Sequence, residues 1–260
     1  MKILRDSILL IGSFGLIWAL FTYVPVFEDV DVGISMEQEE HLGKVIMETF
    51  YDSKTHQRIE NNAADSALRK IATRLQTGLG LTEYDYNIIL VKDESINAFT
   101  LPGGNIVVLT GLMEFAENPE EVASVLAHEM GHVEKRHVVD RLVAEFSLTV
   151  LFSVLTGGDG VLLQDILQTL LSQGFSRTQE EEADAYALDL LVKSSVSPRA
   201  LASFFRRLNT KYGTADDQLE ILLSHPAKNS RIKSSLEYKI PEEFEAKDFE
   251  LDWEKVKASI

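Results

Sequence analysis

Two histidines with a glutamate beside the first form the most reactive combination in this sequence. His128, Glu129 and His132 read H-E-x-x-H inside a stretch predicted to be helical. Residues four apart on an α-helix lie on one face, roughly 5–6 Å apart, so two imidazoles at this spacing can bind one tetrahedral zinc ion. Glu129 could then take a proton from a metal-bound water. A surface helix with two chance histidines is the alternative, so the chain must supply a third ligand elsewhere.

A second predicted helix offers that ligand. It opens at Ser176 with a pattern that resembles a capping box, and it places Glu180 and Asp184 four residues apart on one face. Glu180 could complete a His2Glu set and leave the fourth position for water. Asp184 could accept a hydrogen bond from a ligand imidazole and fix its tautomer. The alternative is a solvated acidic helix start, because Glu181 and Glu182 continue the acidic run.

The H-E-x-x-H helix is predicted to begin at Asn118 and to run to about Arg141. Asn118 suits the cap, and Pro119 suits the first turn. On such a helix His137 would lie five residues beyond His132, roughly 140° further round the axis. His137 is therefore not expected to share their metal.

The remaining pattern predicts a mostly helical α+β domain with a small antiparallel sheet. Helices are expected over 36–51, 63–76, 176–191 and 197–208, and strands over 84–91, 97–100 and 105–110. Pro102, Gly103 and Gly104 form the turn between the last two strands. The hairpin could simply complete the sheet, or one of its strands could border a cleft and hold an extended peptide by main-chain hydrogen bonds.

Two further apolar stretches, 142–155 and 161–171, are each too short to span a membrane and predict a helical hairpin. This hairpin could be core, a lid or an element that dips into the bilayer surface. His41 and His56 belong to no motif and are expected to be ordinary surface or helix histidines.

The first apolar stretch, over 7–27, is long enough to cross a bilayer as a helix. Lys2 and Arg5 precede it and three acidic residues follow it, so the positive-inside bias predicts a cytoplasmic N-terminus and an extracytoplasmic body. A cleaved signal peptide is the competing hypothesis, but the exit from this stretch offers no A-x-A-like small residues.

Composition excludes several classes of function. The formal net charge of −16 argues against nucleic acid as a partner, because phosphate binding needs Lys and Arg. The chain contains no cysteine, which excludes disulfides, thiolate zinc ligands and a cysteine nucleophile.

Taken together, these motifs resemble a known family. The ordered set comprises Asn97-Ala98-Phe99, Leu101-Pro102-Gly103-Gly104, the H-E-x-x-H segment, Phe175-Ser176-Arg177, Glu180-x-x-x-Asp184, His225-Pro226 and Arg231-Ile232. It resembles the zinc metalloendopeptidases that include the heat-shock protease HtpX, the mitochondrial Oma protease and the periplasmic BepA and LoiP proteases. The resemblance covers roughly residues 37–238.

The resemblance implies a gluzincin fold with one Zn2+ per chain. His128, His132 and Glu180 would be the metal ligands, with Glu129 as the catalytic general base and Asp184 as a catalytic carboxylate that either supports a metal ligand or handles protons. His225 matches a histidine that approaches the metal in some resting members. Arg231 matches an arginine placed to bind substrate or the oxyanion. Asn97, Gly103 and Gly104 are also expected to take part in substrate binding.

The expected protein is a membrane-anchored, extracytoplasmic zinc endopeptidase, periplasmic in a Gram-negative cell. We expect an anchor over 1–30, a peptidase domain over 31–240 and an acidic tail over 241–260. By resemblance, the substrates are polypeptides, in particular misfolded envelope proteins. Alternatives are a regulatory protease for one membrane partner, a catalytically silent chaperone or scaffold, and an unrelated cytosolic metallohydrolase.

Overall fold

The computed structural model describes residues 33–52, 57–157, 160–172, 174–212, 225 and 229–260. Residues Ile34–Ile260 form one compact unit. None of the helices in the described part of the chain is both long enough and apolar enough to cross a membrane. The predicted membrane helix over 7–27 and the surface position predicted for His56 lie outside the described residues.

A four-stranded mixed sheet lies at the centre of this unit. Its strands are β1 (Gln57–Ile59), β2 (Asn87–Lys92), β3 (Ala98–Leu101) and β4 (Asn105–Leu109), in the order β1-β2-β4-β3. β1 and β3 pair antiparallel with their neighbours, whereas β2 and β4 run parallel. The predicted all-antiparallel sheet is therefore wrong. The β3–β4 hairpin docks on β2 through its second strand, and all five residues of that strand are buried, as suits an interior position.

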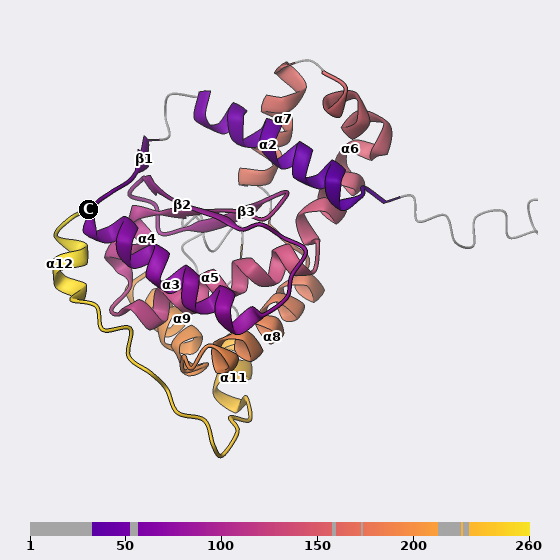
Figure 1. The fold of residues 1–260 in the computed structure, drawn as a ribbon. Coiled ribbons are helices and arrows are strands. Elements are labelled where there is room, and N and C mark those ends of the chain that lie inside the picture. The colour runs from indigo at the N-terminus through magenta and orange to yellow at the C-terminus, as the bar shows by residue number, and fades with distance from the viewer. Residues whose placement is uncertain (1–32, 53–56, 158–159, 173, 213–224, 226–228) are drawn as a thin grey trace, which may run out of the picture. The chain divides into compact units, whose positions relative to one another are not determined.

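Helices cover both faces of the sheet because the side chains of its central strands alternate between two cores. Ile89 and Val107 pack with α2 (Met36–Asp52), α6 (His137–Leu155) and α7 (Gly160–Ser172). Leu90 and Ile106 point to the other face, where they pack with α3 (Ala63–Leu79), α5 (Pro119–Glu134), α8 (Arg177–Lys193) and α9 (Arg199–Tyr212). Figure 1 shows the sheet between these two groups of helices. The short helices are α4 (Thr110–Phe115), α11 (Asn229–Glu237) and α12 (Trp253–Lys257).

The helical hairpin predicted from the two apolar stretches corresponds to α6 and α7. One face of it is core, since Leu151, Val154, Ile166 and Leu170 are buried against α2 and the sheet. Phe152, on the same hairpin, is 40% exposed.

The C-terminal stretch beyond residue 240 packs on the core around α3. Phe249 is fully buried, and the indole N–H of Trp253 donates to the carbonyl of Ala116 at 3.0 Å. The Arg74 guanidinium lies 3.7 Å from the centre of the Phe249 ring. Figure 1 shows α12 at the C-terminal end, close to α4.

The prediction of one unbroken helix to about position 141 is also wrong. Helix α5 ends at Glu134, Arg136 adopts a left-handed conformation with φ 55° and ψ 26°, and α6 begins at His137. The Nε–H of Arg136 donates to Glu39 Oε2 at 3.0 Å, and its Nη2 donates to the carbonyl of Ile34. These contacts with the start of α2 override the local preference for helix.

Candidate metal centre

Helix α5 carries the H-E-x-x-H residues through the interior of the unit. Asn118 caps it by accepting a hydrogen bond from the backbone N–H of Glu121 at 3.0 Å, and Pro119 lies in its first turn, as predicted. Its residues are buried on every side from Glu121 to Val133. Polar side chains on such a helix need partners inside the protein.

A glycine lets a second helix approach this one closely. A Cβ atom added to Gly131 would lie 2.9 Å from the carbonyl oxygen of Ala183 on α8. Real side chains do not tolerate that distance, so a glycine is required at this crossing. The predicted capping box at the start of α8 is confirmed: Ser176 accepts from the Gln179 N–H, and the Gln179 side chain accepts from the Ser176 N–H. The first turn of α8 thereby places Glu180 beside the two histidines.

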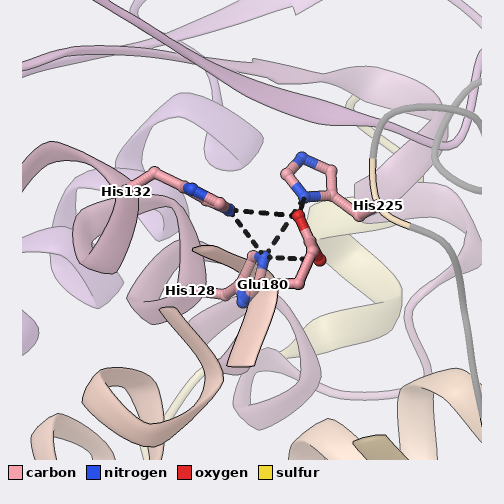
Figure 2. A group of neighbouring side chains, drawn as sticks. All are labelled: His128, His132, Glu180 and His225. Atoms are coloured by element: carbon pink, nitrogen blue, oxygen red, sulfur yellow. Dashed lines mark hydrogen bonds and ion pairs between the residues drawn. The ribbon is translucent and has the colours of Figure 1, made fainter. Parts of the chain in front are cut away.

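Four ligand atoms converge between these helices. Figure 2 shows His128, His132, Glu180 and His225 pointing toward one another. Nε2 of His128 lies 3.1 Å from Nε2 of His132 and 3.2 Å from Nδ1 of His225. Oε1 of Glu180 lies 2.8 Å from Nδ1 of His225 and 3.4 Å from Nε2 of His132. The four residues are 0–6% exposed.

This geometry fits a zinc ion. Ligands about 2.0–2.1 Å from a tetrahedral zinc lie about 3.3 Å apart. The observed separations lie near that value, and one ligand atom from each of the four residues falls within 4.8 Å of the others. Imidazole nitrogen and carboxylate oxygen are ligands that zinc accepts. The four residues can therefore hold a metal ion.

Asp184 and Arg231 contact the residues of the cluster and hold them in position. Asp184 Oδ1 lies 2.9 Å from His128 Nδ1, which leaves His128 Nε2 directed at the cluster. Arg231 donates to both oxygens of Asp184, from Nε at 2.8 Å and from Nη2 at 2.6 Å. Its Nη1 lies 2.9 Å from Glu180 Oε2. One arginine thus bridges the two carboxylates of α8, the geometry that its planar guanidinium favours.

The surrounding charges shift the pKa values of the cluster. Burial by itself would raise the pKa of Glu180, but His225, His132 and His128 together hold that pKa well below its ordinary value. Burial by itself would lower the pKa of His225, yet Glu180 and Glu129 hold it above its ordinary value. Burial lowers the pKa of His132. An ionised Glu180 and a neutral His132 are the forms of these two residues that bind a metal cation.

Glu129 lies beside the cluster and is held by the sheet. It is 1% exposed, and its Oε1 lies 3.4 Å from His225 Nε2. The hydroxyl of Thr100, on β3, lies 2.9 Å from Glu129 Oε2. A pocket of about 10 Å³, lined by Glu129, His128, His225, Val125, Leu201 and Phe205, adjoins it. A pocket of this size holds about one water molecule.

The other residues predicted for substrate binding lie in different places. Arg231 is 5% exposed and engages the two carboxylates of α8. Among the described residues, no hydrogen bond or ion pair joins Asn97, Gly103 or Gly104 to the cluster. The N–H of Gly103 donates to Glu39 Oε1 at 3.2 Å, and both glycines have positive φ in the turn before β4.

Three side chains near the cluster had no role in the sequence prediction. Thr100 contacts Glu129, Phe175 stacks on the His132 ring with 3.8 Å between ring centres, and His137 contacts His132 through its Nδ1. Thr100 lies between two of the sequence motifs and Phe175 lies within one. A threonine or a phenylalanine at such a position does not by itself indicate a functional role. The position of His137 depends on the break at Arg136, which the helical pattern does not predict.

Comparisons with known proteins show which sequences this chain resembles. The sequence model described as peptidase family M48 matches residues 62–239, more than half of the chain. The chain is 30% identical to the beta-barrel assembly-enhancing protease of Yersinia pestis over 183 residues, which cover 65% of this chain and 37% of that protein. It is 28% identical to the mitochondrial metalloendopeptidase OMA1 of Arabidopsis thaliana over 217 residues, 82% of this chain and 44% of the relative. With the metalloprotease YcaL of Escherichia coli, identity is 29% over 171 residues, 63% of this chain and 65% of the relative. The chain thus spans less than half the length of the first two relatives.

Proposed function

This chain belongs to peptidase family M48, and on that premise we propose that it is a zinc-dependent metalloendopeptidase. The observation that carries the proposal is the convergence of His128, His132 and Glu180, from two helices, with Glu129 alongside. These three residues would be the resident ligands of one Zn2+. Zinc bound there would polarise the scissile carbonyl and acidify a water.

Other side chains of this protein would carry out proton transfer and hold the ligands in position. Glu129 takes the proton of the attacking water and returns it to the leaving amine. Thr100 holds the Glu129 carboxylate through a hydrogen bond of 2.9 Å. Asp184 fixes His128 as the tautomer with the proton on Nδ1, and Arg231 keeps Asp184 and Glu180 in place.

His225 supplies the fourth ligand atom of the cluster, and in our proposal it keeps the enzyme latent. Its Nδ1 lies 3.2 Å from His128 Nε2, where a water or substrate oxygen would have to bind for catalysis. The four residues are nearly inaccessible, so part of the chain has to move before a substrate reaches the metal, and in our proposal His225 is that part. The alternative is that His225 helps to bind substrate or transition state.

Polypeptides are the proposed substrates, and the outer strand of the sheet offers a way to hold them. β3 lies at an end of the strand order, and its Thr100 contacts Glu129. A peptide that adds to β3 in extended form would therefore pass close to the general base. Asn97, Gly103 and Gly104 flank this strand, which is the basis for their proposed part in substrate binding.

The proposed biological role is protein quality control in the cell envelope. It is supported by the name of the Yersinia pestis relative, a beta-barrel assembly-enhancing protease. The apolar stretch over 7–27 would anchor the chain, with the catalytic part on the extracytoplasmic side. A catalytically silent chaperone that keeps the peptidase fold is the rival hypothesis, and the presence of Glu129 beside a complete ligand set favours an active enzyme.

Comparison of wild type with Glu129→Gln tests the proposal. Wild type should hold one zinc per chain and degrade envelope proteins, whereas Glu129→Gln should keep the zinc and lose activity by about 10²–10⁴-fold. Degradation profiling of envelope proteins in cells, with zinc content measured in parallel, gives both readouts. Equal turnover with the two forms would refute the peptidase assignment and leave the chaperone hypothesis.

A further inference from the structure

His132 uses its two ring nitrogens in opposite directions. Nε2 faces the cluster, 3.1 Å from His128 Nε2, whereas Nδ1 lies 2.9 Å from Nδ1 of His137. His137 is 2% exposed, and its Nε2 lies 3.1 Å from Glu182 Oε2. The three side chains form a line from the cluster to a carboxylate whose side chain is 51% exposed.

One arrangement of protons satisfies every contact in this line with both imidazoles neutral. A His132 that binds a metal through Nε2 carries its proton on Nδ1, and this N–H then donates to His137 Nδ1. His137 must accept at Nδ1, so its own proton lies on Nε2 and donates to the Glu182 carboxylate. Each donor meets one acceptor, and the carboxylate end selects the tautomer of both rings.

The bend between α5 and α6 creates this line. On an unbroken helix His137 would lie roughly 140° round the axis from His132. The left-handed conformation of Arg136 redirects the chain, and the contacts of Arg136 with Glu39 and the carbonyl of Ile34 hold it there. A left-handed arginine is intrinsically unfavourable, so its presence immediately before His137 indicates a position held by tertiary contacts.

Helix α8 also explains why a bridging histidine is needed. Glu180 and Asp184 are four residues apart and lie on the helix face that is directed toward the cluster. Glu182 is two residues from each of them and cannot share that face. Among the contacts of the described residues, Glu182 is linked to the cluster through His137. The same helix would thus supply one metal ligand, a direct partner for His128 and an indirect partner for His132.

We propose that His137 and Glu182 position the metal ligand His132 by fixing its tautomer and ring orientation, an inference that rests on the proposed zinc-dependent function. Phe175, stacked at 18° on the His132 ring, restricts the same ring from its face. Removal of an outer partner of a ligand histidine typically lowers metal affinity by about 10–100-fold.

Two substitutions at position 137 separate positioning from packing. The side-chain oxygen of asparagine can occupy the place of the imidazole Nδ1 and accept the His132 proton, whereas leucine fills similar space without an acceptor. Zinc affinity is measured on the full-length chain by competition with a chelator. We expect His137→Leu to lower it by about 10–100-fold and His137→Asn to restore most of that loss.

Glu182→Gln tests the outer end of the line. It should weaken zinc binding by less than His137→Leu, about 3–10-fold, because the carboxylate is half exposed and acts through one intermediate ring. In a His137→Asn background, Glu182→Gln should leave zinc affinity unchanged, because the imidazole that links Glu182 to His132 is already absent. Glu181→Gln, exposed on the same helix, is the matched control and should bind zinc as wild type does.

Unfolding of the metal-free variants in urea, measured in parallel, reports their fold stability. The proposal is overturned if His137→Leu binds zinc as tightly as wild type, or if His137→Asn binds it as weakly as His137→Leu. A wild-type chain that binds no zinc would instead contradict the proposed function, which distinguishes the two failures.

Discussion

The hydroxyl of Thr100 lies 2.9 Å from Oε2 of Glu129 and 3.1 Å from its backbone carbonyl, so an outer strand of the sheet directly contacts the proposed general base. Both residues are buried, at 3% and 1% exposure. The strand that would receive the substrate and the carboxylate that would activate water are thus connected by one side chain.

Replacement of Thr100 should therefore impair catalysis. A hydrogen bond to a charged group contributes about 1.5–3 kcal/mol, so Thr100→Val, which keeps the shape, should lower kcat by about 10–100-fold. Thr100→Ser keeps the hydroxyl and should retain most activity. Cleavage of a denatured protein substrate by both variants at equal zinc content is the measurement, and a fully active Thr100→Val would contradict the role.

Removal of Glu180 should remove the metal. Glu180→Ala deletes one of the three proposed zinc ligands and leaves Arg231 Nη1 without its partner at 2.9 Å. Glu181→Ala changes the exposed neighbour on the same helix and should keep stoichiometric zinc. Zinc content after dialysis compares the two. Zinc retained in Glu180→Ala but lost in Glu181→Ala would show that the ligand assignment on α8 is wrong.

His225→Ala distinguishes a latent enzyme from one that uses His225 on its substrate. A cap lowers basal cleavage in proportion to the fraction of molecules in which it occupies the fourth position, so its removal should raise basal cleavage, by about 10-fold if about one molecule in ten is uncapped. If His225 instead binds substrate, His225→Ala should lower the rate of cleavage. His41→Ala, on the exposed side of α2, is the control. Initial cleavage rates at saturating zinc show whether His225→Ala raises or lowers activity.

The pairing of Asp184 with Arg231 predicts a pH dependence of stability. Burial by itself would raise the pKa of Asp184, but Arg231 and His128 hold it below its ordinary value. A carboxyl with a lowered pKa in the folded state stabilises the protein fully above the pKa of the unfolded state, and this contribution is lost as the pH falls through the folded-state pKa.

In the metal-free protein, Asp184→Asn should therefore lower the free energy of unfolding at pH 7 by about 3 kcal/mol, since it leaves a buried charge partly unpaired. The difference from wild type should shrink progressively below about pH 4, where the unfolded-state carboxyl protonates. Urea unfolding between pH 3 and pH 7 measures it, with Glu181→Gln as control. A difference that stays constant over this range would exclude the electrostatic explanation.

The apolar stretch over 7–27 predicts the behaviour of the chain in cell fractions. About 20 apolar residues anchor a helix in a bilayer by the hydrophobic effect, so the chain should stay in the membrane fraction after a high-salt wash. The catalytic part should be accessible to added protease from the extracytoplasmic side. A soluble form that begins near Glu28 would show that the segment is a cleaved signal peptide.

The sequence alone determined the residues whose chemistry depends on local spacing. His128 and His132 are brought together by one turn of helix, and Glu180 and Asp184 share a face for the same reason. Caps at Asn118 and Ser176 were also predictable, because a cap is a contact between residues three apart. The position of most helices followed from apolar periodicity.

The tertiary structure decided what depends on contacts between distant residues. The strand order could not be predicted from the sequence, because β4 pairs in parallel with β2 although β3 lies between them in the chain. The break at Arg136 was hidden because Glu39, 97 residues away in sequence, holds it. His137 reaches His132 only as a result of that break, and Thr100 reaches Glu129 only through the packing of β3 on α5. A periodic pattern records which side of an element is buried, whereas these contacts depend on which elements meet.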